Sequence, residues 1–564
     1  MAAEQGSRGR RVAVVTGGAI GIGAAIAEEL GRQGAYVVTL DPMVAVDGRP
    51  QTDTAEQTTA ERIVEAGGAA RASNTSVTDE PAVRALFAEL VDEFGALDTV
   101  VNVAGISRPT GFASGTEEDW AGVLAVHLDG YLTVLRVALP LMAAAGRGQI
   151  LGGTSGSGWR AADAGAYSCA KRAVASLTWQ IGRAAPPGVS VNALSPIAAT
   201  RMVAGALARQ ASSGTGDGSG KSAASGGVAL SAAPPPEHLG PIGAYLAGPE
   251  FAWSSGRVMF SNGAEVSVVA PPHLLEVART TAVGSVARVL DAVVPGAFVP
   301  AEAAQVSNGG SVPRLGTAFT DPAPDAGAAS GRRAVVVSDD EGWGAALGDA
   351  LTSRGVACTV VGPAEGFAAK AEQIEQSAGA AGPVDAVVVA LMGAGAMPGS
   401  PGTGAARWQQ VLAEHAGITE HIRTDAGWVR AAADYSARTE RPVRVVTCTD
   451  ATTFGGKSRA MAATQLARSA RSATGDRVEA YVVGVETATD AGRRATAEAV
   501  ARLVSADDAS VLSGAELVAE AEWFGLRSHP SVFGTVTYGG PEIPDWVDPV
   551  LRRIATHDVA LEED

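Results

Sequence analysis

The stretch RRVAVVTGGAIGIGAAIAEEL, from Arg10 to Leu30, joins an apolar run to a run of small and apolar residues through a glycine-rich loop. The first run predicts a buried strand, and the second predicts a helix that begins at the loop. Glycines in such a loop let the backbone turn tightly and approach a pyrophosphate, which the free N–H groups of the helix start can bind. The stretch therefore predicts a dinucleotide site, with a tight turn that binds no ligand as the alternative.

Asp41 ends the next apolar run, AYVVTLD. It follows the glycine loop at about the distance where an acid binds the adenosine ribose. A carboxylate accepts hydrogen bonds from ribose hydroxyls and would repel a 2′-phosphate, and no arginine directly follows Gly17 or Asp41. The sequence therefore predicts NAD rather than NADP as the cofactor, and an exposed Asp at a strand end is the alternative.

From Val12 to about Val269, apolar strands alternate with helical patterns, which predicts a parallel, doubly wound sheet. One segment, between Met202 and Glu237, is instead rich in Gly, Ser and Pro. We expect it to be either a lid over the substrate or a solvated spacer.

The pattern restarts with RRAVVVSDDEGWGAALGDAL, from Arg332 to Leu351, in which three acidic residues replace the start of the glycine loop. LDTVVNVAG then returns as VDAVVVALMG, and WAGVLAVH returns as WQQVLAEH. Similarity at this distance indicates two related domains rather than a solenoid of short repeats. We expect a catalytic domain at 1–299, a linker at 300–331 and a degenerate domain at 332–564.

The bulk composition describes a globular protein of 564 residues with a formal net charge of −17. That charge disfavours nucleic acid and anionic membranes as partners, because a phosphate surface would repel it. Three scattered cysteines fit free thiols in a reducing compartment. We see neither a signal peptide nor an apolar run of about 18 residues, and therefore expect a cytoplasmic protein without a membrane partner.

Tyr167 and Lys171 lie four residues apart in a predicted helix, so their side chains share one face. A neighbouring ammonium favours the phenolate, so we expect Lys171 to lower the pKa of Tyr167 into the range of an acid–base catalyst. Ser155 ends the preceding strand, where a hydroxyl can reach the ligand crevice or cap a turn.

Together, TGGAIGIG, NVAG at Asn102 to Gly105, Ser155, Tyr167-x-x-x-Lys171 and NALSP resemble the short-chain dehydrogenase/reductase family over residues 10–269. The resemblance implies hydride transfer between a substrate carbon and the nicotinamide of NAD. It also implies that Ser155 orients the substrate oxygen, Tyr167 exchanges a proton, and Lys171 binds the nicotinamide ribose. The cofactor-binding residues that it implies are Thr16, Gly17, Gly21, Ile22, Gly23, Asp41, Ser76, Val77, Asn102, Ala104, Gly105, Tyr167, Lys171, Pro196, Ile197 and Thr200.

Three positions depart from the family pattern. Val103 replaces the second Asn of NNAG, Ser76 replaces an Asp, and His127 replaces the helix Asn of the proton relay. The motif VHLDG around His127, and SPIAATRM further on, resemble the hydroxyacyl-CoA and hydroxysteroid dehydrogenase branches. His127 is therefore a fourth candidate for the catalytic set, or a histidine that only packs in its helix.

The second half lacks the corresponding chemistry. Gly362 matches Asp41, Asp450 matches Ser155, and no Tyr-x-x-x-Lys follows. The acids Asp339, Asp340 and Glu341 would repel phosphate. We expect this half to bind no dinucleotide and to pack against the first half like the second subunit of a dimer, while an independent domain with its own ligand is the alternative.

These observations predict an α/β protein with two tandem doubly wound parallel-sheet Rossmann-like domains. The function that we expect is an NAD-dependent oxidoreductase interconverting a secondary alcohol and a ketone, with a small-molecule substrate that is bulky and apolar, such as a hydroxyacyl-CoA or a steroid. We also expect that the chain can form a homo-oligomer and that the site holds no metal. The alternative is a non-catalytic, NAD-responsive interaction protein, which would not need Ser155, Tyr167 and Lys171 together.

Overall fold

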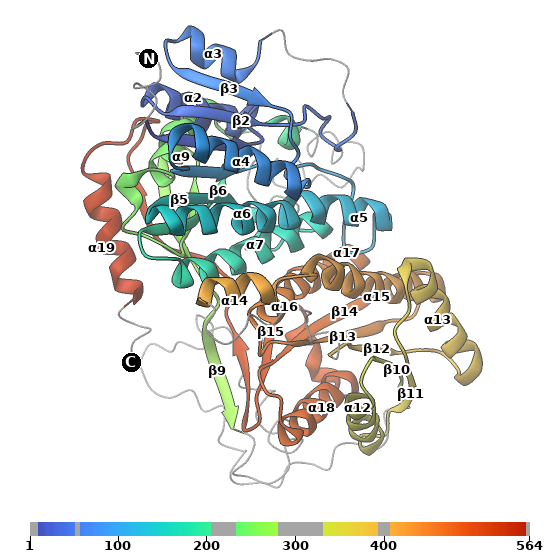
Figure 1. Cartoon of the computed structure of the whole chain (residues 1–564). Coiled ribbons are helices and arrows are strands. Elements are labelled where there is room, and N and C mark those ends of the chain that lie inside the picture. Colours follow the sequence, from blue (N-terminus) through green and yellow to red (C-terminus); the bar gives the residue numbers. More distant parts are fainter. Residues whose placement is uncertain (1–9, 51–56, 205–232, 280–330, 393–405, 560–564) are drawn as a thin grey trace.

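The computed structural model describes residues 10–50, 57–204, 233–279, 331–392 and 406–559. Two mixed, mainly parallel sheets form the framework, and a layer of helices lies between them (Figure 1). This is the expected pair of doubly wound, Rossmann-like α/β units. Most of the Gly/Ser-rich segment and of the expected linker at 300–331 lie outside the described residues.

The first sheet has nine strands in the order β17-β8-β7-β6-β5-β4-β1-β2-β3. The strands from β3 to β7 are parallel, and β8 and β17 are antiparallel to their neighbours. Nearly every residue in the central strands is buried, because helices cover both faces of the sheet. The bounds are β1 (Val12–Thr16), β2 (Tyr36–Leu40), β3 (Ala69–Ser73), β4 (Thr99–Asn102), β5 (Gly148–Gly153), β6 (Val189–Pro196), β7 (Val258–Ser261), β8 (Glu265–Ala270) and β17 (Ser531–Thr537).

Alternate residues of β1 point to two different cores. Ala13 and Val15 pack with the side of the sheet covered by α2 and α9, and Val12 and Val14 pack with the side covered by α4, α6 and α7. The helix bounds are α2 (Gly21–Arg32), α3 (Thr59–Glu65), α4 (Glu80–Phe94), α5 (Glu117–Leu124), α6 (Gly130–Ala145), α7 (Gly165–Ala184) and α9 (Gly240–Leu246).

The second sheet repeats this order with eight strands, β11-β10-β12-β13-β14-β15-β16-β9. It has no described counterpart of β3, so β11 is its edge and Val360 is 49% exposed. The strand bounds are β9 (Leu274–Arg279), β10 (Arg333–Ser338), β11 (Ala357–Val361), β12 (Ala386–Ala390), β13 (Val443–Asp450), β14 (Val478–Val485), β15 (Glu516–Ala519) and β16 (Trp523–Arg527). The helix bounds are α12 (Glu341–Ser353), α13 (Gly366–Ala381), α14 (Arg407–Glu414), α15 (Ile418–Thr439), α16 (Phe454–Ala467), α17 (Ala470–Thr474), α18 (Asp490–Ser505) and α19 (Val547–Val559).

The two halves meet through helices that lie between the sheets. Helix α7 packs along α16, α14 contacts α6 and α7, and α15 contacts α5 (Figure 1). One hydrophobic cluster runs without a break from the α4, α6 and α7 side of the first sheet to the α15 and α16 side of the second. The interface therefore has the character of a domain core.

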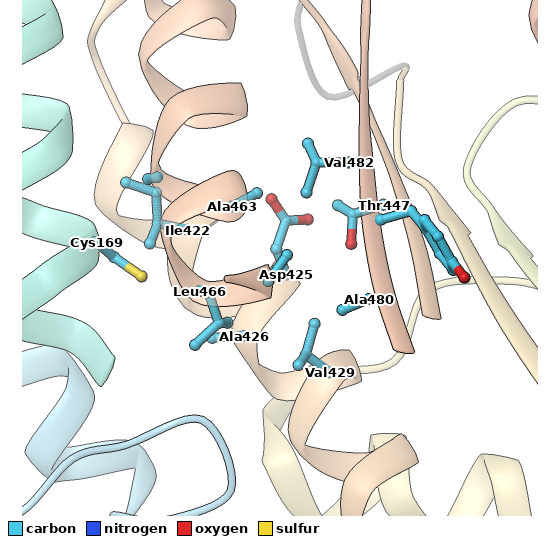
Figure 2. A pocket seen from close by; sticks show the side chains of 13 residues that line it. Cys169, Ile422, Asp425, Ala426, Val429, Thr447, Ala463, Leu466, Ala480 and Val482 are labelled. Carbon is cyan, nitrogen blue, oxygen red and sulfur yellow. The ribbon is translucent and has the colours of Figure 1, made fainter. Parts of the chain in front are cut away.

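The packing of this interface is tight around Cys169 of α7. Its side chain points toward Ile422 of α15 and Leu466 of α16 (Figure 2). The cavity enclosed there measures about 10 Å³, which is at the lower limit of the space that one water needs.

The expected domain boundaries at 299 and 332 miss an exchange of strands between the halves. Strand β9, from the first half, pairs with β16 of the second sheet, and β17, from the second half, pairs with β8 of the first. Helix α19 follows β17 onto the first half, where Asp548 accepts hydrogen bonds from Tyr245 and Trp253 at 2.6 and 2.9 Å. Sequence similarity could not reveal the exchange. The order of the strands along the chain agrees with the repeated pattern, and only the sheet that β9 and β17 each join is different.

Two helical segments of the layer between the sheets are interrupted. A π-helical turn at Ala125–Asp129 separates α5 from α6, and Gly417, with φ +72°, separates α14 from α15. The helical run 117–145 is long and apolar enough to cross a membrane, contrary to our expectation from the sequence. However, 72% of its most apolar window is buried inside the molecule, and core helices of globular proteins have the same composition.

Candidate active site

A cavity of about 520 Å³ lies at the carboxyl ends of the first-sheet strands, between the glycine loop and the start of α7. Ligands of doubly wound sheets bind at this edge. Most of the expected cofactor residues line the cavity: Gly17, Gly21, Ile22, Gly23, Asp41, Ser76, Val77, Ala104, Gly105, Tyr167, Lys171, Pro196 and Thr200. The structure therefore brings together residues that are up to 183 positions apart, from Gly17 to Thr200.

The glycine loop has no room for side chains. A Cβ at Gly17 would lie 2.8 Å from Cα of Ala104, and one at Gly23 would lie 2.1 Å from the carbonyl oxygen of Gly17. Gly17 and Gly21 also have φ values of +66° and +58°, which favour glycine. At its glycine positions the loop thus brings backbone close to the cavity at the start of α2, where free N–H groups of a helix start suit a pyrophosphate.

Asp41 lies beside this loop at the end of β2. Its carboxylate accepts hydrogen bonds from the backbone N–H of Met43 at 2.9 Å and of Ala19 at 3.3 Å. These contacts fix the carboxylate at the wall of the cavity, with lone pairs left for further donors.

Four residues expected at the site do not line the cavity: Thr16, Asn102, Ser155 and Ile197. Thr16 and Asn102 support the wall instead, because the Thr16 hydroxyl donates to Asn102 at 2.9 Å and accepts from the N–H of Ala104 at 3.2 Å. This pair links the ends of β1 and β4.

Lys171 is 5% exposed, and its Nζ donates to the carbonyl oxygen of Gly153 at 2.5 Å. Nζ lies 5.7 Å from the centre of the Tyr167 ring. Desolvation lowers the pKa of Lys171 to about 7.

Tyr167 shares a hydrogen bond with Ser155, and this contact lowers the pKa of Tyr167. Burial outweighs that contribution and raises the pKa above its ordinary value. The expectation that Lys171 lowers the pKa of Tyr167 is therefore wrong for the chain alone, because burial dominates and the Lys171 ammonium is directed to Gly153. Ser155 also accepts a hydrogen bond from the N–H of Ser157 at 3.3 Å, so it caps a turn as well as contacting Tyr167.

His127 lies in the π-helical turn and is 2% exposed. Its Nε2 is 2.8 Å from the carbonyl oxygen of Ile106, and its ring stands edge-on to Tyr167 with centroids 4.9 Å apart. Burial, together with the charge of Lys171, holds the pKa of His127 well below its usual value, so the ring is neutral at pH 7. Its Nδ1 is buried without a hydrogen-bond partner among the described residues.

The sequence analysis missed the loop that follows Asp41. Pro42, Val44, Ala45, Val46 and Gly48 line the cavity with Arg108, whose Nε donates to the carbonyl oxygen of Asp47 at 2.9 Å. No sequence motif identifies this loop, because it contributes the path of its backbone and apolar side chains to the cavity wall. Other lining residues that were not predicted are Ile20, Leu40, Thr78, Val103, Ile106, Gly122, Ala125, Val126, Gly153, Thr154, Arg201 and Met202.

In the second half, the acids of the corresponding loop have internal partners. Asp340 caps α12 by accepting from the N–H of Trp343 at 2.8 Å, and Asp339 accepts from the N–H of Met392 at 2.8 Å. Arg493 covers the same helix start, because a Cβ at Gly342 would lie 1.9 Å from its guanidinium. Side chains of this half therefore contact the start of α12, the position that corresponds to the glycine loop of the first half.

The second half also lacks counterparts of the first-half catalytic side chains and of the first-half cavity among the described residues. Helix α16 contains no tyrosine, and its Arg459 forms a bidentate ion pair with Asp425, with both N–O distances at 2.7 Å. The cavity beside Arg459, which Asp450 also lines, measures about 30 Å³. This volume is far too small for a nicotinamide ring.

Comparisons with known proteins agree with this architecture. A family model described as short chain dehydrogenase matches residues 11–211. The hydroxyacyl-CoA dehydrogenase ChsB1 of Mycobacterium tuberculosis is 32% identical over 275 residues, which are 47% of this chain and 81% of that protein. The cis-4-hydroxycyclohexanecarboxylate dehydrogenase of Sinomonas cyclohexanicum is 40% identical over 201 residues, which are 35% of this chain and 76% of that protein.

A solved structure extends the likeness to both sheets. The N-domain, with NADP, of a bacterial malonyl-CoA reductase superposes with a TM-score of 0.63 at 18% identity, covering 88% of this chain and 95% of that one. At this identity the likeness concerns the fold alone. The family match and the two relatives concern the first half, and they carry the assignment: the chain belongs to the short-chain dehydrogenase family, whose members bind a nicotinamide cofactor, and it is an enzyme of the dehydrogenase and reductase kind.

Proposed function

We propose that this protein is an NAD-dependent oxidoreductase that interconverts a secondary alcohol and a ketone in the first-half cavity. The observation that carries the proposal is that Tyr167, hydrogen-bonded to Ser155, and Lys171 lie on the wall of one cavity together with the glycine-rich loop. A protein that only sensed NAD would need the glycine-rich loop but not a hydroxyl pair beside a buried lysine.

The preference for NAD rests on Asp41. Its fixed carboxylate at the cavity wall can accept from the 2′- and 3′-hydroxyls of an adenosine ribose. A 2′-phosphate there would meet like charge. The loop from Pro42 to Gly48, together with Ser76 and Val77, would hold the adenine side.

The chemistry assigned to the chain's own side chains is proton transfer and orientation. When bound, the nicotinamide accepts or supplies the hydride. Ser155 holds the substrate oxygen, and Tyr167 exchanges the proton of that oxygen. Lys171 contributes positive charge near the phenol once it is protonated, which favours the phenolate. His127 is neutral and buried, and it shapes the floor beneath Tyr167 or passes a proton through Nδ1.

The proposed substrate is bulky and apolar, such as a hydroxyacyl-CoA or a hydroxysteroid. Two observations support this class: the similarity to ChsB1, and the apolar residues Ile106, Val126 and Met202 on the cavity wall. The second half is proposed to be structural, with no dinucleotide of its own.

A panel of secondary alcohols with NAD, read by NADH absorbance, tests the proposal. It should include 3-hydroxyacyl-CoAs, hydroxysteroids and cyclic secondary alcohols, each against the Tyr167→Phe variant as a matched blank. We expect at least one class to be oxidised by the wild type only. NAD binding without turnover on any class would instead favour the non-catalytic, NAD-responsive alternative.

A further inference from the structure

The turn that follows Ser155 is held by side chains of the second half. Residues Gly156–Gly158 form a 3-10 turn, and Trp159 and Arg160 complete the loop. Gln465 of α16 donates through its Nε2 to the carbonyl oxygens of Ser157 at 2.9 Å and Arg160 at 2.8 Å. Arg468, which directly follows α16, donates to the carbonyl oxygen of Trp159 at 2.9 Å.

Gln465 is itself fixed on its other side. It is 0% exposed, and its Oε1 accepts from Arg172 at 3.2 Å and from Arg468 at 3.2 Å. Arg172 is also 0% exposed and forms an ion pair with the buried Glu516 at 2.8 Å. All hydrogen-bonding atoms of the Gln465 amide are thus used, and the orientation of the amide is determined by two cations on one side and two carbonyls on the other.

The position of this turn affects the position of Ser155, one of the proposed catalytic residues. Ser155 starts the turn and shares a hydrogen bond with Tyr167. A Cβ at Gly158 would lie 2.7 Å from the backbone of Lys171, so the turn lies against the backbone of α7. A shift of the turn would therefore move Ser155 relative to Tyr167, and small misplacements of reacting groups cost large factors in rate.

The first half supplies its own contacts to the turn. Its N–H groups at Gly158, Trp159 and Arg160 bond only within the turn, to Ser155 and Gly156. Side-chain links within the first half include the indole of Trp159, which donates to Ser195 at 3.0 Å, and Arg160, whose guanidinium lies 5.3 Å from the centre of the Phe260 ring. Gln465 and Arg468 add hydrogen bonds to the carbonyl oxygens of three turn residues, Ser157, Trp159 and Arg160.

We propose that Gln465 and Arg468 are positioning residues of the first-half active site, so that the degenerate half orients the turn that carries Ser155. The catalytic consequence of this inference rests on the proposed function. The hydrogen bonds from Gln465 and Arg468 to the turn, which we call the clamp, do not depend on it. The second half would then contribute to the reaction without binding a cofactor or touching the substrate.

Hydrogen–deuterium exchange of the full-length chain, followed by mass spectrometry of peptides covering residues 155–166, tests the clamp without any substrate. Gln465→Met keeps the volume and removes both donors. We expect it to accelerate exchange at residues 158–160 about tenfold or more, because the turn opens more easily. Ser458→Ala is the matched control: Ser458 lies on the same helix and contacts Ser176 and Gln180 of α7, not the turn. It should leave exchange in the turn unchanged.

Equal exchange in the wild type and in Gln465→Met would overturn the clamp, and so would equal acceleration by Ser458→Ala. If Gln465→Met does not fold, Arg468→Met removes the bond to Trp159 and one of the two donors to Oε1 of Gln465, while both donors of Gln465 to the turn remain. It should therefore give a smaller acceleration in the same peptide.

Kinetics then test the positioning role with the alcohol that the panel identifies. Gln465→Met should lower kcat about tenfold while NAD affinity, measured by calorimetry, stays unchanged, and Ser458→Ala should lower neither. Accelerated exchange with normal kcat would overturn the positioning role. Absence of any wild-type turnover would be a failure of the proposed function instead, and the exchange result would still decide the clamp.

Discussion

Substituting Arg172 by Met should destabilise the whole chain, because this arginine forms a buried ion pair between the halves. Its Nη2 lies 2.8 Å from Oε2 of Glu516, and the two side chains are 0% and 5% exposed. Removing the cation leaves a carboxylate buried without its partner, which typically costs about 3–5 kcal/mol.

Two further contacts set the expected value within that range. Burial, together with the charge of Arg172, lowers the pKa of Arg468 to about 9, so removing Arg172 relieves repulsion between the two guanidinium groups. It also leaves Oε1 of Gln465 with one donor instead of two. The relief offsets part of the cost, and we expect a loss of about 3 kcal/mol in the free energy of unfolding.

The assay is urea unfolding at pH 7.5, followed in parallel by tryptophan fluorescence and far-ultraviolet circular dichroism. The double variant Arg172→Met/Glu516→Leu replaces the ion pair by apolar groups and should recover at least half of the loss, since buried pairs and apolar pairs are often nearly equivalent. A single-variant loss below about 1 kcal/mol, or a double variant no more stable than the single one, would refute this reasoning.

Three further predictions follow from the site and the interface. Calorimetry should find NAD binding at least about tenfold tighter than NADP, a difference of about 1.4 kcal/mol, and Asp41→Ala should abolish the difference; equal affinities in the wild type would contradict the role of Asp41. Residues 1–300 expressed alone should aggregate or change oligomeric state in size-exclusion chromatography, because β8 loses β17, β9 loses β16 and the face of α7 loses α16; a monomeric, fully active fragment would contradict this. Lys171→Met should stabilise the cofactor-free chain by an amount on the order of a few kcal/mol near pH 8, because a lysine with a folded pKa of about 7 is neutral there while the unfolded lysine holds its proton. This advantage should shrink as the pH rises toward 10.5, the ordinary lysine pKa, and thermal melts across pH 7–10 that show a constant difference would exclude the assignment.

The sequence predicted the elements whose signals are local. The glycine loop, Asp41 at the end of β2, and the Tyr167–Lys171 spacing on α7 all lie within short stretches whose chemistry constrains their shape. The repeated motifs likewise predicted a second sheet built in the same order.

The contacts that depend on tertiary partners could not be predicted in this way. The pairing of β9 with β16 is determined by which sheet edge lies near, and not by a residue in β9. The pKa of Tyr167 depends on burial, which a four-residue spacing does not report. Gln465 is an ordinary polar residue in its helix, and only the packing of α16 against α7 brings it to the Ser155 turn.

From the sequence, the acids at the second glycine-loop position are expected to oppose phosphate, but their structural role was not predicted. Asp340 caps α12, and Asp339 bonds the N–H of Met392, so the charges have internal partners. A capping residue before a helix is itself a sequence signal, and it could have suggested this use.

The central claim is that Tyr167 is the proton-exchanging group of a first-half dehydrogenase. Its most direct test is the comparison of NADH formation by the wild type and by Tyr167→Phe, with the secondary alcohol that gives the highest turnover. The account predicts that kcat falls at least ~100-fold, while the calorimetric affinity for NAD and the single NAD per chain are unchanged. Near-normal turnover in Tyr167→Phe would contradict the account, because the hydroxyl is the only group that this substitution removes.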